Sequence, residues 1–205
     1  MACGLALLAS GQAFATKYSS NTDITAADLD SSSTNWLDDN CGGTFASTNV
    51  DVTDGILQIC AGHTLTLSTD DTLNAYSIMF NTGSWAGSGL KFGPVGTGFD
   101  KMIMNQSGAA MTIASLDLSA MDIGNKITFT EQAMSGLGKT VTFTNVVGGK
   151  SLSCTPSGGT AAPYSGTALA VGTVCAVVAA TVNNSVSAPI FSTKEKPAVF
   201  SEEVK

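Results

Sequence analysis

Residues 124–144 read Gly124-Asn-Lys-Ile-Thr-Phe-Thr-Glu-Gln-Ala-Met-Ser-Gly-Leu-Gly138-Lys-Thr-Val-Thr-Phe-Thr and contain one short pattern twice. The pattern is Gly-x-x-apolar-Thr-apolar, and it also begins at Gly62 and, more loosely, at Gly108. Glycine permits the backbone of a tight turn. Apolar residues that alternate with Thr are typical of a strand with one face on a core. Each copy therefore predicts a turn followed by a half-buried strand.

The same alternation runs from about residue 55 to residue 146, broken by clusters of Gly, Asn, Asp and Ser. Many short strands with such turns predict an all-β fold, and we expect an antiparallel β-sandwich, jelly-roll-like or pilin-like. The intervals between the copies at Gly108, Gly124 and Gly138 are short for one coil of a large right-handed β-solenoid. The solenoid is the alternative fold. The repeat itself reflects either duplication or the ordinary succession of strands and turns.

The composition excludes several classes of protein. The chain has 205 residues with 25 Thr and 23 Ser, all nine of its basic residues are Lys, and its net charge is −7. An acidic chain without Arg lacks the usual phosphate clamp, so we expect no nucleic-acid partner. The high content of Gly, Thr and Ser also argues against a helical bundle.

The chain divides into four segments by composition. Residues 2–15 are apolar and end in Ala13-Phe14-Ala15, which fits the cleavage site of a signal peptide. We therefore expect a signal peptide over 1–15, a polar N-terminal segment over 16–50, a β domain over 51–190 and a charged tail over 191–205. The apolar run is too short to span a membrane, so we expect a secreted or cell-surface protein without a transmembrane anchor. The alternative for residues 1–15 is a buried N-terminal helix or strand.

Four cysteines remain after Cys3, and they fall into two local groups: Cys41 with Cys60, and Cys154 with Cys175. In an exported protein this spacing favours two local disulfides, although four cysteines allow three connectivities. A zinc site is less favoured, because the sequence has one histidine and no Cys-x-x-Cys motif.

No set of residues in the sequence indicates an enzyme, and we expect a protein without catalytic residues or an organic cofactor. His63 is the single histidine, and its place beside a strand is typical of a turn residue. Asp51, Asp54, Asp70 and Asp71 lie in polar stretches. Such residues usually serve turns, but their oxygens make them the candidates for a calcium site.

The first hypothesis for function is an exported structural or adhesive protein, most simply a self-assembling subunit of an extracellular filament or surface layer. Such a subunit can donate a terminal strand to a neighbour's sheet, and Ala198, Val199 and Phe200 are the candidates for this contact. The partner is then a second copy of the chain, with surface glycans as further candidates.

Two alternatives remain. The first is a secreted carbohydrate-binding or carbohydrate-active β protein, with Trp36, Trp85 and Tyr76 as candidate sugar-contacting aromatics. The second is a viral coat protein with a jelly-roll fold, which a signal peptide would argue against.

Overall fold

The computed structural model describes residues 17–29, 33, 35–37, 41, 55–94, 100–131 and 136–180. These residues are almost entirely strand and turn, which confirms the all-β class, and their only helix, η1 (Ala26–Leu29), is a single 3-10 turn. Several predicted features lie outside the described residues: the signal peptide over 1–15, Asp51, Asp54, and the tail over 191–205 with Ala198, Val199 and Phe200.

The strands form three sheets, which we call A, B and C. Sheet A runs in the order β15 (Ala162–Pro163), β14 (Lys150–Thr155), β16 (Val174–Ala179), β12 (Lys126–Thr130), β10 (Lys101–Gln106), β7 (Ser77–Asn81), β4 (Ile56–Ile59), β1 (Lys17–Ser20), β3 (Trp36–Leu37). Sheet B contains β2 (Ile24–Thr25), β5 (Thr64–Thr66) and β8 (Ser84–Trp85). Sheet C contains β13 (Val141–Val147), β11 (Met111–Asp117), β9 (Leu90–Phe92) and β6 (Thr72–Leu73).

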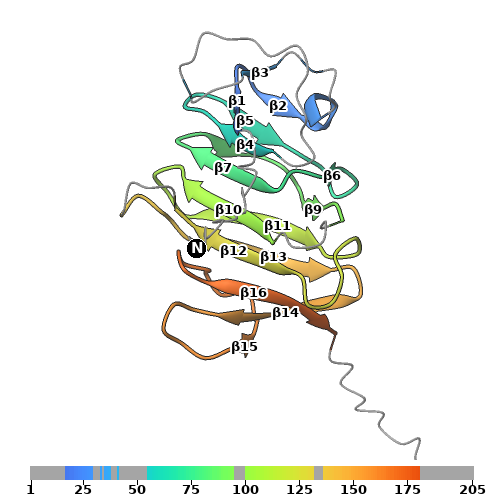
Figure 1. Ribbon diagram of the computed structural model, residues 1–205. Helices are drawn as coiled ribbons and strands as arrows, with labels where there is room; N and C mark the ends of the chain where they lie inside the picture. Colours follow the sequence, from blue (N-terminus) through green and yellow to red (C-terminus); the bar gives the residue numbers. More distant parts are fainter. Residues whose placement is uncertain are drawn as a thin grey trace, which may run out of the picture.

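The chain visits these sheets in turn and returns to sheet A one strand further along. It passes from β4 to β5 to β6, then from β7 to β8 to β9, and the strands that meet in each sheet are parallel. One such circuit is called a coil below. Ile56 pairs with Ser77 and Ser77 with Met102, so one coil carries the chain from Ile56 to Ser77 and the next carries it on to Met102. Figure 1 shows the coils stacked in chain order.

Later coils use two sheets instead of three. Strand β10 leads to β11 through a tight turn at Gly108, whose φ is +86°, without a described strand in sheet B between them. The pairs β7–β10, β10–β12 and β11–β13 remain parallel. The stack is therefore three-sided at its N-terminal end and narrows to two sides from β10 onward.

This pairing corrects the antiparallel arrangement expected for the central strands. Among the described pairs, nine are parallel and four are antiparallel. The physical reason is that each turn carries the chain to a different sheet, so strands adjacent in sequence do not pair. Hydrogen bonds form instead between strands one coil apart, and this makes them parallel.

Antiparallel pairing is concentrated at the C-terminal end. Strand β16 lies between β12 and β14 and is antiparallel to both, and β15 pairs antiparallel with β14. We call β14–β16 the cap. Cys154 and Cys175 face each other in its register and form a disulfide, and a second disulfide joins Cys41 to Cys60 at the other end. Both predicted cysteine pairs are thus confirmed.

One apolar interior lies between the sheets. In the copies beginning at Gly62, Gly124 and Gly138, the two apolar residues are buried and the Thr between them points outward, as the alternation predicts. The polar N-terminal segment also contributes to the sheets, because β1 and β3 belong to sheet A and β2 to sheet B. Tyr18 and Ile24 are the residues of this segment that anchor β1 and β2 in the interior.

Candidate functional site

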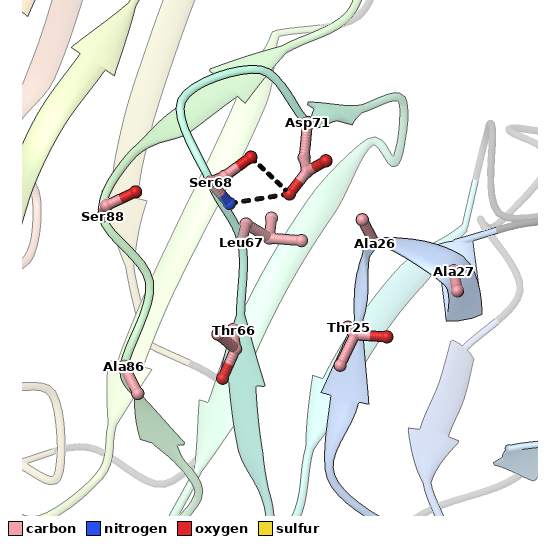
Figure 2. A pocket seen from close by; sticks show the side chains of 9 residues that line it. All are labelled: Thr25, Ala26, Ala27, Thr66, Leu67, Ser68, Asp71, Ala86 and Ser88. Atoms are coloured by element: carbon pink, nitrogen blue, oxygen red, sulfur yellow. Dashed lines mark hydrogen bonds between the residues drawn. The ribbon is translucent and has the colours of Figure 1, made fainter.

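The outer face of sheet B carries a shallow open groove of about 450 Å³. Small side chains line most of it, as Figure 2 shows: Thr25, Ala26, Ala27, Thr66, Leu67, Ser68, Asp71, Ala86 and Ser88. Leu65 and Leu67 are buried in the interior, so Thr64, Thr66 and Ser68 between and beside them project outward. The groove therefore arises directly from the alternation of Leu with Thr and Ser along this segment.

Parallel coils bring the outward residues into rows. Thr25 pairs with Thr66. Trp85 pairs with Leu65, so the next residue, Ala86, lies beside Thr66. The side chains of Thr25, Thr66 and Ala86 therefore lie side by side across the sheet. Neighbouring members of such a row are about 4.8 Å apart. In the next row the Thr64 and Ser84 hydroxyl oxygens are 2.8 Å apart and hydrogen-bonded. The face thus presents hydroxyl and methyl groups at a regular spacing.

Two carboxylates hold the turns that border the groove. The Asp71 carboxylate accepts hydrogen bonds from the Ser68 N–H at 2.7 Å and from the Ser68 hydroxyl at 2.9 Å, drawn dashed in Figure 2. The Asp28 carboxylate accepts from the Thr25 N–H and hydroxyl and from the Asn35 amide. Burial acts to raise the pKa of Asp28, but these hydrogen bonds outweigh it and leave the pKa below its usual value of 3.8.

Asp70 and Asp71, the calcium candidates among the described residues, do not form a metal site. Asp70 is exposed, and one oxygen of Asp71 is already committed to the Ser68 turn. Within the described ranges, no group of three or more His, Cys, Asp or Glu side chains is placed to hold a metal ion. The turn-forming role is therefore the one that geometry supports for Asp71.

The three candidate aromatics do not form an exposed sugar platform. Trp36 is fully buried and its indole N–H donates to the Asp28 carbonyl oxygen at 2.7 Å. Trp85 pairs with the buried Leu65 and packs edge-on against Phe80, with 6.4 Å between ring centroids. Tyr76 is half-buried, with its hydroxyl 3.7 Å from the Met102 sulfur. The structure thus corrects the expectation for Trp36 and Trp85, because register turns both rings inward.

His63 is hydrogen-bonded to Ser20, a long-range contact that sequence reasoning missed. Its Nδ1 lies 2.9 Å from the Ser20 hydroxyl oxygen and 3.0 Å from the Ser20 carbonyl oxygen. A carbonyl only accepts hydrogen bonds, so the second contact places a proton on Nδ1. The ring is then not arranged to take the Ser20 proton, as a catalytic base would be. This supports a structural role, joining β1 to the turn before β5.

Sequence reasoning also missed the small outward-facing residues of sheet B as candidate binding residues, although the repeat pattern predicts that such residues face outward. The Thr at the centre of each copy faces outward, but which copies share a face depends on how the chain coils, and the sequence does not show this. No helix among the described residues meets the length and apolarity needed to cross a membrane. Comparison of the chain with protein-family models, curated proteins and solved structures gives no significant match.

Proposed function

We propose that the chain is a short β-solenoid that acts as an exported adhesive protein and contacts surface polysaccharide through the outer face of sheet B. The observation that carries the proposal is the register of Thr25, Thr66 and Ala86, which places small hydroxyl and methyl groups side by side across three coils. Hydroxyl groups exchange hydrogen bonds with sugar hydroxyls, and methyl groups suit the apolar faces of sugar rings.

The shape of the groove supports a polymer rather than a small molecule as the ligand. Small-molecule sites usually enclose most of the ligand between apolar and aromatic walls. This groove is shallow and lined mainly by Thr, Ser and Ala. An extended chain can lie along such a face and gain many weak contacts, and no catalytic step is part of the proposal.

Export is supported by the two disulfides, since such bonds persist mainly in oxidising compartments. They lie at opposite ends of the coil stack, where an open end would otherwise fray. Secretion or display at the cell surface follows from this part of the proposal. Cleavage after Ala15 stays a prediction, and binding through sheet B does not depend on it.

The two edges of sheet A favour adhesion over self-assembly by terminal strand exchange, although the seven-residue β13 lies at an edge of sheet C. Strand β15, at one edge of sheet A, has two residues and contains Pro163, which has no N–H to donate. Strand β3, at the other edge, also has two residues. Edges this short offer little template for a donated strand.

A glycan array and co-sedimentation with insoluble polysaccharides test the proposal on the full chain, with calcium and with EDTA. We expect binding to at least one extended glycan, retained in EDTA. Absence of binding to every glycan and polysaccharide would contradict the adhesive proposal. Binding that disappears in EDTA would instead support the calcium-dependent alternative.

A matched pair of variants locates the binding face. Thr66 and Thr112 are exposed, each lies in a strand between two buried apolar residues, and they project from sheets B and C respectively. We expect Thr66→Glu to weaken polysaccharide binding at least about tenfold, while Thr112→Glu leaves it unchanged. Equal affinities for the two variants would place the binding face elsewhere.

A further inference from the structure

The disulfide between Cys41 and Cys60 lies in the wall of an open pocket at the N-terminal end of the coil stack. The pocket has a volume of about 380 Å³, and its lining includes Ser20, Leu37 and His63 besides the two cysteines. Cys41 is half-buried, whereas Cys60 is only 6% exposed. Cys41 is therefore the more accessible half of this disulfide.

The side chain of Gln58 holds a hydrogen-bond donor against the Cys41 sulfur. Gln58 is 1% exposed, and its amide nitrogen lies 3.1 Å from that sulfur. The Oε1 atom of the same amide is buried and has no hydrogen-bond partner among the described residues. A disulfide sulfur accepts hydrogen bonds weakly, whereas a thiolate is charged and accepts them strongly. Stabilisation of a thiolate on Cys41 would explain why this buried amide keeps an unpaired oxygen.

The other disulfide of the chain is less accessible. Cys175 is fully buried, and the pocket that Cys154 borders has a volume of about 190 Å³. These two cysteines face each other on β14 and β16 within sheet A. A thiolate must reach a disulfide sulfur in order to attack it. The disulfide of the cap therefore provides an internal comparison for reactivity.

We propose that the Cys41–Cys60 disulfide is a thiol–disulfide exchange site whose substrate is a dithiol. One thiolate of the dithiol attacks the Cys41 sulfur, the bond between the two protein sulfurs breaks, and Cys60 leaves as a thiolate. The second thiolate of the dithiol then attacks its own sulfur in the mixed disulfide and releases Cys41 as a thiolate beside the Gln58 amide. The dithiol loses two electrons and becomes a disulfide, and its two protons end on Cys41 and Cys60.

The surroundings of Cys60 can accept its reduced form. The Cys60 sulfur lies 4.0 Å from the Gln58 carbonyl oxygen. A disulfide sulfur has no proton to donate, but the thiol that reduction creates is a weak donor. The carbonyl oxygen is therefore in place to receive the new S–H group.

Cys60 also begins the turn that leads from β4 into β5 of sheet B. The Cys60 N–H donates to the Ser20 hydroxyl at 2.9 Å, and the Cys60 carbonyl accepts from the His63 N–H at 3.0 Å. At the first residue of β5, the Thr64 N–H donates to the Asp23 carboxylate at 2.8 Å. Reduction removes the covalent anchor of this turn, so we expect it to loosen the turn and the start of β5.

The exchange site goes beyond the proposed function, and only a control of adhesion through β5 would rest on it. The experiments below follow sulfur chemistry and amide exchange without any glycan. Failure of the exchange site and failure of glycan binding are therefore separate results.

Limited reduction by dithiothreitol tests the proposal on the full chain. Thiols present at the start are blocked with iodoacetamide, and thiols that appear later are trapped with N-ethylmaleimide and located by peptide mass spectrometry. We expect the Cys41–Cys60 disulfide to open at least about tenfold faster than the Cys154–Cys175 disulfide, because access governs attack. Equal rates, or faster opening of the Cys154–Cys175 disulfide, would overturn the proposal.

Glutathione, which has a single thiol, identifies the sulfur that is attacked. We expect brief exposure to glutathione to give a mixed disulfide on Cys41, with the thiol of Cys60 trapped by N-ethylmaleimide. Glutathione found mainly on Cys60 would contradict the assigned direction of attack. Both experiments use the unaltered chain, so they decide the proposal even if a variant fails to fold.

A matched pair of variants tests the part assigned to Gln58. Gln58→Leu removes the donor at the Cys41 sulfur, and Ser77→Ala removes the other buried side-chain oxygen of sheet A that has no partner among the described residues. After reduction, we expect Gln58→Leu to slow the alkylation of Cys41 by iodoacetamide at pH 7 at least about threefold, because less of the thiol is ionised. A merely looser fold would speed it instead. Unchanged or faster alkylation in Gln58→Leu, or equal slowing in Ser77→Ala, would refute this role.

Amide hydrogen exchange measured by NMR tests the link to sheet B. When only the Cys41–Cys60 disulfide is reduced, we expect the N–H groups of Cys60, His63 and Thr64 to exchange at least about fivefold faster, while those of β14 and β16 are unchanged. Unchanged exchange at all three groups would show that the disulfide does not control the turn before β5.

Discussion

The parallel coils of residues 55–147 and the antiparallel cap of residues 150–179 use similar strands but pair them in opposite ways. Ile56 pairs with Ser77 in the coils, and Cys154 pairs with Cys175 in the cap. The two pairs have the same separation in sequence, yet the first is parallel and the second antiparallel. Sequence separation therefore does not determine strand direction.

What differs is the route between the paired strands. From β4 to β7 the chain passes through sheets B and C and completes a circuit. From β14 to β16 the one described strand is β15, which folds back on β14 within the same sheet, and Leu169 then forms a single antiparallel bridge with Val141 of β13. Since β16 is antiparallel to both β12 and β14, it closes the stack as an inserted strand that breaks the parallel succession. Such an end discourages further coils from adding to the sheet.

The largest expected effect comes from the contact that joins the coils to the cap. Phe143 is fully buried on β13, with ring centroids 6.1 Å from Phe129 and 6.2 Å from Tyr164. Phe143→Ala should lower the free energy of unfolding by about 3–5 kcal/mol through lost burial and the cavity it leaves. The neighbouring outward substitution Thr142→Ala should change it by less than about 0.5 kcal/mol. Urea unfolding checks both, and similar losses would contradict the assigned interior.

Removing the two disulfides one at a time tests whether the two ends of the molecule open independently. The bridges have sequence separations of 19 and 21, and each should contribute roughly 3 kcal/mol by the chain-entropy relation. Cys154→Ser with Cys175→Ser should speed amide exchange in β14 and β16 more than in β7. Cys41→Ser with Cys60→Ser should affect β1 and β4 first. Uniform exchange changes in both variants would show that coils and cap open as one unit.

The turn between the coils and the cap offers a matched glycine pair. Gly148 and Gly149 have φ of +93° and +70°, a region that L side chains rarely adopt. A Cβ at Gly148 would lie 2.4 Å from the Ser119 nitrogen, whereas one at Gly149 meets nothing within 4 Å. Gly149→Ala should therefore cost about 1 kcal/mol from φ alone, and Gly148→Ala about 2 kcal/mol or more. Equal losses in thermal unfolding would contradict the tight packing of this turn.

Tyr164 gives the smallest effect and a pH dependence. Its hydroxyl donates to the Phe143 carbonyl at 3.0 Å and accepts from the Phe143 N–H at 2.8 Å. Tyr164→Phe should cost about 1 kcal/mol at pH 7. Burial raises the pKa of Tyr164 above its usual 10.0, although the hydrogen bond from Phe143 partly opposes this shift.

The sign of that pH dependence follows from the raised pKa. Above pH 10 the unfolded chain loses the Tyr164 proton while the folded chain still holds it, so the stabilisation is complete below pH 10 and declines as pH rises further. The difference in stability between the original chain and Tyr164→Phe should therefore shrink in alkaline solution. A difference that stays constant from pH 8 to pH 11 would contradict the burial of this hydroxyl.

The strands between residues 55 and 146 and the cysteine pairs were predictable from sequence, but β14, β15 and the winding were not. The interval between the copies at Gly108 and Gly138 equals the interval between the paired residues Met111 and Val141, which is one full coil. The intervening copy at Gly124 belongs to sheet A, on another side of the stack. The two short intervals on either side of Gly124 are thus two parts of one coil, not successive strands of a meander.

The candidate site was hidden for the same reason. The directions of the Trp85 and Thr66 side chains depend on which residues pair between β5 and β8. Local alternation in the sequence does not determine this long-range register. Strand β1 was also missed, because three of its four residues are Lys or Ser. Its Ser side chains are buried by tertiary contacts that polarity alone does not indicate.

The most direct test of the account is an NMR measurement of strand direction, because the proposed binding face requires parallel coils. Nuclear Overhauser contacts between β7 and β10, and between β5 and β8, distinguish the two arrangements. We expect contacts between the amide and α protons of Ile78 and Ile103, and of Leu65 and Trp85, in the parallel pattern. Close α-proton to α-proton contacts across these strands, which mark antiparallel pairs, would contradict the coils and the face on sheet B.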